Sequence, residues 1–299
     1  MKAEKEGWMV SVRLAVATGA VVATIMAFMA HAVGQVSPAP AVVFVDDFSG
    51  PDLNRANWNV MVSGRVVNNE QQAYLDSAET IAIVRDAAAE GAENGALAIR
   101  PRFRAGFTTP EGRSLDFISG RLESRGKAEF TYGIVAARIK LTAGAGLWPA
   151  FWLLGTGRWP DTGEMDIMEN VGDSSWTNVA LHGPGYSGNT PLVARRSFPA
   201  PADATGWHVY AVDWTTAGFV FSVDGDVFYR PTRADVEKYG RWAYDTPKFL
   251  ILNFALGGQY PQSVNKTTAP YPGLPQSTVD LLKTGNVRML VDWVRVTRQ

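Results

Sequence analysis

Short apolar runs, many with every second position apolar, follow one another along most of the chain and are separated by Gly, Asn, Asp and Pro. Alternation with a period of two is typical of strands that bury one face, and few segments keep the longer period of a helix. The clearest predicted strands are 81–85, 96–100, 134–141, 177–182, 207–214 and 287–296. This pattern predicts an all-β sandwich.

Two short peripheral helices are predicted outside the strands. One lies near 233–239, and the other covers 278–283, with Ser277 as its cap and Gly285 as its stop. The segment 261–276 is rich in Pro, Thr and Gln, and it is predicted to be an irregular surface loop. Loops at the rim of a sheet often shape a binding cleft.

A hairpin and a single domain are also predicted. The runs 219–223 and 227–229 flank Asp224-Gly225-Asp226, which strongly favours a tight turn. No internal repeat or low-complexity linker interrupts 42–299, so we expect one domain there, preceded by a flexible lead-in over 33–41.

The amino terminus has the pattern of a targeting segment. Residues 10–30 are mostly apolar and run into Ala30-His31-Ala32, an A-x-A cleavage pattern. We therefore predict a signal peptide over 1–32 and a secreted or periplasmic protein that leaves the membrane after cleavage. The alternative is an uncleaved membrane anchor, which the length of the apolar segment nearly permits.

Composition and net charge limit the classes of molecule that the protein is expected to bind. The chain has 299 residues, 46% of them hydrophobic and 19% charged, so it can bury a sizeable core. Its formal net charge of −1 gives no electrostatic reason to bind nucleic acid and favours neutral partners. With no cysteine, thiol catalysis and disulfides are excluded. We expect a monomer.

One stretch, Gly163-Glu164-Met165-Asp166-Ile167-Met168-Glu169-Asn170, places three acids among apolar residues. Alternation puts Glu164 and Asp166 on one face of a strand and Glu169 on the other. A β-bulge at Ile167 or Met168 adds one residue, reverses the parity, and brings Glu169 to the same face as the other two acids.

Acids held together on a partly buried face suggest acid–base chemistry. Mutual repulsion and burial keep at least one of them protonated near neutral pH. Two carboxyl groups about 5–5.5 Å apart can serve as nucleophile and acid/base in a retaining glycosidase. We assign Glu164 as nucleophile, Asp166 as electrostatic partner and Glu169 as acid/base.

Two plainer interpretations of the acids compete with catalysis. One is a solvated strand face, because charged side chains usually lie on the surface. The other is a carboxylate metal site, which is disfavoured because no histidine accompanies the acids in the sequence.

Aromatic residues gather around the acidic stretch: Trp148, Phe151, Trp152, Trp159 and Trp176. Each alone is more often a core residue, but together with the acids they favour a cleft for a neutral polysaccharide, whose sugar rings stack on aromatic faces. His182 ends a strand predicted beside the acids, where it either faces the cleft or has a structural role. His208 is interpreted as structural.

The acidic stretch closely resembles the active-site signature of glycoside hydrolase family 16, in the bulged form of the laminarinases, which are endo-β-1,3-glucanases. Further motifs along the chain fit the same family: Asn68-Asn69-Glu70 with Gln72 and Tyr74, Ser119-Gly120-Arg121, Tyr132-Gly133, Leu147-Trp148-Pro149-Ala150-Phe151-Trp152, Trp159-Pro160, His182-Gly183, and Asn253 with Gly257-Gly258. Together they cover most of the chain beyond the signal segment.

The resemblance implies a concanavalin A-like β-jelly roll of two curved antiparallel sheets, with a concave substrate cleft and retaining hydrolysis of internal β-glucosidic bonds. It implies the same roles for Glu164 and Glu169. Positions similar to the family's sugar-binding ones are Asn69, Trp148, Trp152, Trp159, His182, Gln259 and Tyr260. The chemistry needs no cofactor, but many members bind a structural calcium ion, for which Asp47, Asp292 and the backbone near Gly95 are the similar positions.

Departures from the family pattern concern the sugar-binding positions. Gln259-Tyr260 stands where Asn-Trp is common, Ile134-Val135-Ala136 where Arg-Phe-Glu is frequent, and Arg65-Val66-Val67 where an aromatic residue is usual. The predicted function is a secreted endo-β-glucanase for β-1,3 bonds of laminarin-type or mixed-linked glucans. The alternatives are a non-catalytic β-glucan-binding protein on the same fold and a family 16 enzyme for a galactan such as agar or carrageenan.

Overall fold

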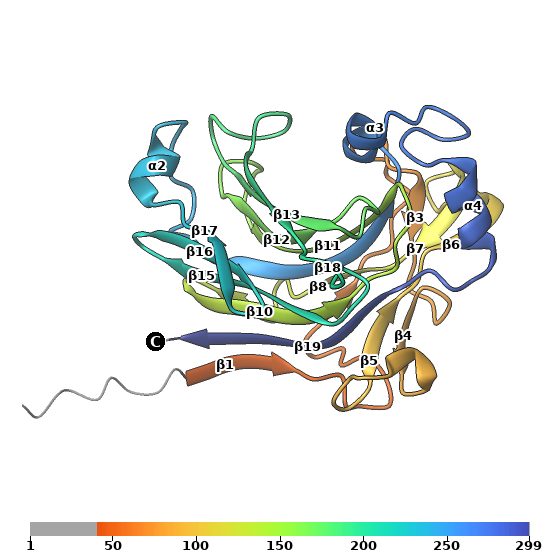
Figure 1. Cartoon of the computed structure of the whole chain (residues 1–299), viewed down its shortest axis with the longest axis horizontal. Coiled ribbons are helices and arrows are strands. Elements are labelled where there is room, and N and C mark those ends of the chain that lie inside the picture. The colour runs from red at the N-terminus through yellow and green to blue at the C-terminus, as the bar shows by residue number, and fades with distance from the viewer. Residues whose placement is uncertain (1–40, 299) are drawn as a thin grey trace, which may run out of the picture. The chain divides into compact units, whose positions relative to one another are not determined.

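The computed structural model describes residues 41–298, which form two large packed sheets and a small third one (Figure 1). This is the predicted all-β jelly-roll sandwich. The predicted signal peptide, and the lead-in as far as residue 40, lie outside the described residues. Within 41–298 the structure contains no helix with the length and apolarity needed to cross a membrane.

The inner sheet is curved into a trough, with helices α2 and α3 on opposite sides of its open face (Figure 1). Its strands are hydrogen-bonded in the order β14-β13-β12-β11-β18-β8-β2, and β9 pairs with β18. Their bounds are β14 Leu192–Ser197, β13 Trp176–His182, β12 Glu164–Glu169, β11 Leu147–Gly155, β18 Lys248–Leu256, β8 Arg121–Glu123, β2 Asn59–Val60 and β9 Glu129–Phe130. One face of this sheet meets the core and the other lines the trough.

The outer sheet has the order β17-β16-β15-β10-β19-β5-β4, and β1 pairs with β19. Its strands are β17 Asp226–Tyr229, β16 Gly218–Val223, β15 His208–Thr215, β10 Gly133–Lys140, β19 Met289–Arg298, β5 Ala96–Ile99, β4 Ile81–Val84 and β1 Ala41–Asp46. In β10 and β15 nearly every second side chain is buried, as expected where one face packs on the core and the other meets solvent.

A third sheet and four short helices complete the domain. The sheet has the order β3-β7-β6, with β3 Gln72–Tyr74, β7 Ser114–Ser119 and β6 Arg102–Thr108. The helices are the 3₁₀ turn η1 Ala87–Ala89, α2 Arg233–Glu237, α3 Gln259–Asn265 and α4 Gln276–Lys283.

The predicted hairpin is present, with β16 and β17 joined by a two-residue turn. Val223 pairs with Asp226, and the two turn residues, Asp224 and Gly225, have φ values of 53° and 84°. Positive φ at both central positions is what a type I′ turn requires, and Asp-Gly accepts it at low cost. All strands predicted from the alternating pattern are present within two residues of their predicted ends.

The helical predictions need corrections at their ends. α2 is two residues shorter than predicted and begins with a capping box between Thr232 and Asp235. α4 begins two residues early, with Pro275 rather than Ser277 at the N-cap, because an extended proline suits a helix start. The predicted loop 261–276 was wrong over its first residues: α3 occupies Gln259–Asn265, with Pro261 inside its first turn, where a missing N–H costs little.

Candidate active site

The predicted bulge is present in β12. Phe151 and Trp152 of β11 pair with Met168 and Asp166, so Ile167 has no partner in that ladder. The register with β13 shifts at the same place. Ile167 and Met168 are both buried in the core, at 2% and 0% exposure, so two consecutive side chains point inward.

The bulge brings all three acids to the trough side. Their partners on β11 are Leu154, Trp152 and Ala150 for Glu164, Asp166 and Glu169 respectively. These partners are spaced by two residues and therefore share one face of β11. The predicted gathering of the acids on one face is thus what the register produces.

Glu164 lies between a tryptophan and a histidine. Trp159 donates its indole N–H to Glu164 Oε2 at 2.9 Å. His182, the cross-strand partner of Glu164 on β13, places Nε2 3.6 Å from Glu164 Oε1 and 3.3 Å from Asp166 Oδ2. Of the two interpretations of His182, the structure therefore supports the one in which it faces the cleft.

Glu169 has a different set of neighbours. Trp148 donates its indole N–H to Glu169 Oε1 at 3.0 Å. Asn178 pairs with Glu169 across β13 and also hydrogen-bonds its carboxyl group. Tyr260 packs edge-on against Trp148, with ring centroids 5.5 Å apart, so it extends the aromatic lining at this end.

The electrostatics of the three acids follow from burial. Desolvation raises the pKa of Glu164, Asp166 and Glu169, and the Asp166 carboxylate raises the pKa of both glutamates further. The His182 imidazole and the indole donors act in the opposite direction on the two glutamates. The acids therefore titrate as one set that keeps protons near neutral pH, and such a set can supply a carboxylate and a carboxylic acid together.

Gly163 and Lys248 hold the turn of the chain that precedes Glu164. Gly163 has a φ of 72°, and a Cβ there would lie 2.6 Å from the carbonyl oxygen of Ala243. The fully buried Lys248 donates from Nζ to the carbonyl oxygens of Thr162, Ala243 and Thr246 at 2.7, 3.1 and 3.2 Å. These contacts anchor the turn that leads into β12.

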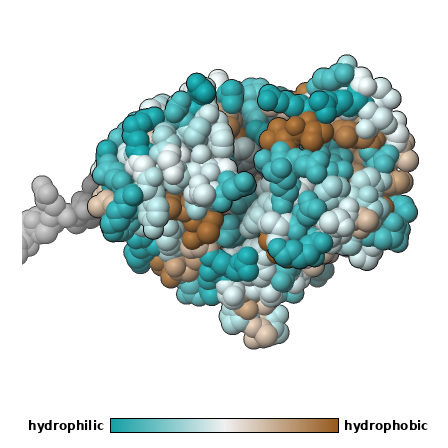
Figure 2. Space-filling model, turned by 90° about the horizontal axis from the view of Figure 1, so that it is seen from above, coloured by the Kyte–Doolittle hydropathy of each residue, from teal (hydrophilic) through white to brown (hydrophobic). Residues whose placement is uncertain are grey.

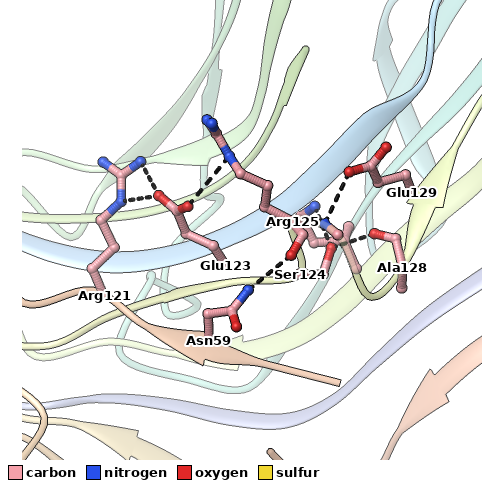
Figure 3. Close-up of polar contacts among 9 residues, drawn as sticks. Asn59, Arg121, Glu123, Ser124, Arg125, Ala128 and Glu129 are labelled. Atoms are coloured by element: carbon pink, nitrogen blue, oxygen red, sulfur yellow. Dashed lines mark hydrogen bonds and ion pairs between the residues drawn. The ribbon is translucent and has the colours of Figure 1, made fainter. Parts of the chain in front are cut away.

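A network of polar side chains surrounds Trp152 in the trough. The indole of Trp152 donates to Asn253 Oδ1 at 2.7 Å, and the Asn253 amide reaches the Tyr74 hydroxyl at 3.1 Å. The Arg121 guanidinium lies over the Trp152 ring, 5.0 Å from its centroid. Glu123 pairs with this guanidinium at 2.6 Å (Figure 3).

Two further predicted sugar-binding residues, Asn69 and Gln259, lie where the turn at Asn68 meets the start of α3. The Gln259 N–H donates to the carbonyl oxygen of Asn68 at 2.7 Å, which brings Asn69 and Gln259 to neighbouring exposed positions. Trp159 is 45% exposed. Figure 2, seen from above, shows this face of the molecule hollowed between raised, mainly hydrophilic margins.

Some residues of the trough were not among the predicted site residues. Asn178 shares its strand and face with His182, so alternation along 177–182 carried a signal for it. Arg195 pairs with Asn178 across β14, and its guanidinium covers the Trp176 ring at 3.7 Å, but β14 was not predicted. His208 has the structural role that we expected, because Asp224 and the carbonyl oxygen of Asp203 contact its two ring nitrogens.

The positions predicted for calcium do not gather a cation's ligands. Asp292 accepts from the Glu93 N–H at 2.9 Å through one oxygen and pairs with Arg138 through the other. Asp47 is engaged by Ser49 and Asn94. Calcium takes six to eight oxygen ligands, whereas here a guanidinium already neutralises Asp292. Calcium binding stays a prediction that melting curves with calcium and with a chelator would test.

Comparisons with known proteins agree with this geometry. The family model described as glycosyl hydrolases family 16 matches residues 54–271. A β-glucanase of Rhodothermus marinus is 33% identical over 84% of this chain and 82% of its own length. The glucan endo-1,3-β-glucosidase A1 of Niallia circulans is 27% identical over 86% of this chain, which spans 38% of that protein.

The fold has solved counterparts as well. The structure of an endo-β-1,3-glucanase from Pyrococcus furiosus superposes with a TM-score of 0.72 at 31% identity, covering 87% of this chain and 94% of the other. The family match spans well over half of the sequence and contains all three acids. The chain therefore belongs to glycoside hydrolase family 16.

Proposed function

We propose that this protein is an exported, retaining endo-β-glucanase that cleaves β-1,3 bonds in laminarin-type or mixed-linked glucans. The observation that carries the proposal is the bulge in β12, which puts Glu164 and Glu169 on one face, each with an indole donor. A strand without the bulge would send one glutamate into the core.

The mechanism follows from this pair. Glu164 attacks the anomeric carbon while Glu169 gives its proton to the departing glycosidic oxygen, which leaves a covalent glycosyl-enzyme. Glu169, now ionised, takes a proton from water, and the water oxygen displaces Glu164 with net retention of configuration. Asp166 lies between them on the strand, and its charge helps to keep the acid/base protonated.

The trough supports an internal cut in a neutral polymer. Figure 2 shows a hollow on the open face above the inner sheet, where an internal stretch of a polymer could lie. The indoles of Trp148, Trp152 and Trp159 offer rings for stacking. The N–H groups of Trp148 and Trp159 contact the two glutamates, and that of Trp152 contacts Asn253. Relatives named for β-1,3-glucan cleavage support the linkage.

The A-x-A pattern before residue 33 supports export to the periplasm or the medium. We also propose that the exported protein acts as a monomer, which light scattering would test.

The test is product analysis after incubation with laminarin, lichenan, agarose and carrageenan, with Glu164→Gln as a matched variant. We expect a ladder of oligosaccharides from laminarin and no products from the variant. Products from agarose or carrageenan alone would overturn the glucanase assignment in favour of a galactanase. Binding of laminarin without hydrolysis by the wild type would favour a glucan-binding protein.

A further inference from the structure

Glu164, Asp166 and His182 form a cluster with the spacing of a metal site. One ligand atom from each lies within 4.8 Å of the other two. His182 Nε2 is 3.3 Å from Asp166 Oδ2 and 3.6 Å from Glu164 Oε1. A tetrahedral ion bound at about 2.0–2.1 Å sets its ligands about 3.3–3.5 Å apart, so the two distances from His182 Nε2 to the carboxylate oxygens are already close to the required separation.

A second observation concerns a buried oxygen. Asp166 is 4% exposed, and its Oδ2, the atom that faces His182, has no hydrogen-bond partner among the described residues. Buried polar atoms are nearly always satisfied, and an exception calls for an explanation such as an ion. A cation between Asp166 Oδ2 and His182 Nε2 would use a lone pair from each.

Glu164 can complete the set. Its Oε2 accepts from Trp159 at 2.9 Å, which leaves Oε1, the oxygen nearer to His182, available. One imidazole nitrogen and two carboxylate oxygens suit zinc, whereas calcium and magnesium prefer more numerous oxygen ligands. Three protein ligands leave a fourth position for water.

We infer that Glu164, Asp166 and His182 bind a divalent ion of the zinc class, and that the ion inhibits the enzyme by occupying Glu164 and the space for the sugar. The sequence alone disfavoured a metal site because no histidine accompanied the acids, but the pairing of β12 with β13 supplies one. The inhibitory effect rests on the proposed function, whereas the binding does not.

The experiment titrates tag-free protein with Zn²⁺ by calorimetry in a non-coordinating buffer. Wild type should bind one ion, and Asp166→Asn and His182→Gln should each weaken binding by about tenfold or more. Glu169→Gln is the matched control, because it changes an acid on the same face outside the cluster; its affinity should stay within about threefold of wild type. Equal affinity in all four proteins, or no binding below millimolar Zn²⁺, would overturn the inference.

Two further readouts separate the claims. In the unaltered protein, the imidazole resonances of His182 should shift on Zn²⁺ addition while those of His208 stay in place, and the reverse pattern would contradict the site. Zn²⁺ should inhibit laminarin hydrolysis competitively, with recovery after chelation. If the wild type binds Zn²⁺ at His182 but cuts no glucan without it, the metal site stands and the proposed function fails.

Discussion

Glu164 and Glu169 lie at the two ends of one strand, and their surroundings differ although their side chains are the same. The Glu164 end has a histidine within 3.6 Å and an exposed tryptophan as donor. The Glu169 end has a half-buried indole and an amide as donors. Neighbouring side chains, rather than residue type, therefore give the two glutamates different surroundings, as the proposed division into nucleophile and acid/base requires.

The largest expected effect comes from neutralising each glutamate in turn. Glu164→Gln should lower kcat on laminarin by about 10⁵-fold, because it removes the nucleophile. Glu169→Gln should lower it by about 10²- to 10⁴-fold, but should retain most activity on an aryl glucoside whose leaving group needs no proton. Initial rates on both substrates check this, and a rescue of Glu164→Gln by the aryl substrate would reverse the assignment.

Deletion of Ile167 tests the role of the bulge. Without the extra residue, Glu169 follows Glu164 by four positions, so simple alternation keeps both glutamates on one face and the folded fraction should retain measurable activity. Ile167→Val keeps the bulge and should cost only about 0.5–1.5 kcal/mol of stability, with activity unchanged. Rates per folded molecule and urea unfolding test both. Complete loss of activity in a folded deletion variant would contradict the account in which the bulge only restores the parity of the acids.

Lys248→Met tests the support of the Glu164 end. The change leaves one buried and two partly buried carbonyl oxygens without this donor, so we expect a loss of about 2 kcal/mol or more in the free energy of unfolding. Thermal melting measures it. Lys238→Met, at an exposed ion pair, is the control and should leave the melting temperature within experimental error. A melting temperature of Lys248→Met equal to that of wild type would contradict the stabilising role of Lys248.

The smallest effect concerns the pH profile. Burial raises the pKa of Glu169 above its usual range, so the acid/base keeps its proton near neutral pH, and activity should fall as pH rises through the upper pKa of the coupled acids. Trp148→Phe removes a donor that favours the carboxylate, which raises the pKa and should move the alkaline limb of kcat/KM upward by up to about one unit. The control is Trp207→Phe. The Trp207 indole donates to the carbonyl oxygen of Glu90, so its loss should leave the alkaline limb of kcat/KM in place. A downward shift in Trp148→Phe would contradict the sign.

The structural features that depend on residues close together in the sequence could be predicted. Alternation indicated the six clearest strands, Asp224-Gly225 indicated the turn, and the parity of the three acids required the bulge. Residues in contact across strands were harder to predict. Asn253 meets Tyr74 from a segment 179 residues away, and Arg195 meets Asn178 from β14, a strand that the alternating pattern did not reveal.

Helix α3 and the ion pair of Asp292 could not be predicted, because both depend on contacts with residues outside their own segments. Gln259–Asn265 is a helix although its composition is that of a loop, since it packs against the turn at Asn68 and the segment at Gly273. Arg138, which neutralises Asp292, comes from β10, 154 residues earlier in the chain, so nothing near Asp292 signals it.

The most direct test of the two roles is the configuration of products formed with azide from an activated β-glucoside. In Glu164→Ala, azide replaces the missing nucleophile and attacks the substrate itself, so a single displacement should give the α-glycosyl azide. In Glu169→Ala, azide attacks the glycosyl-enzyme formed on Glu164, so two displacements should give the β-glycosyl azide. NMR of the products decides it: α from Glu164→Ala and β from Glu169→Ala supports the account, and the opposite pair contradicts it.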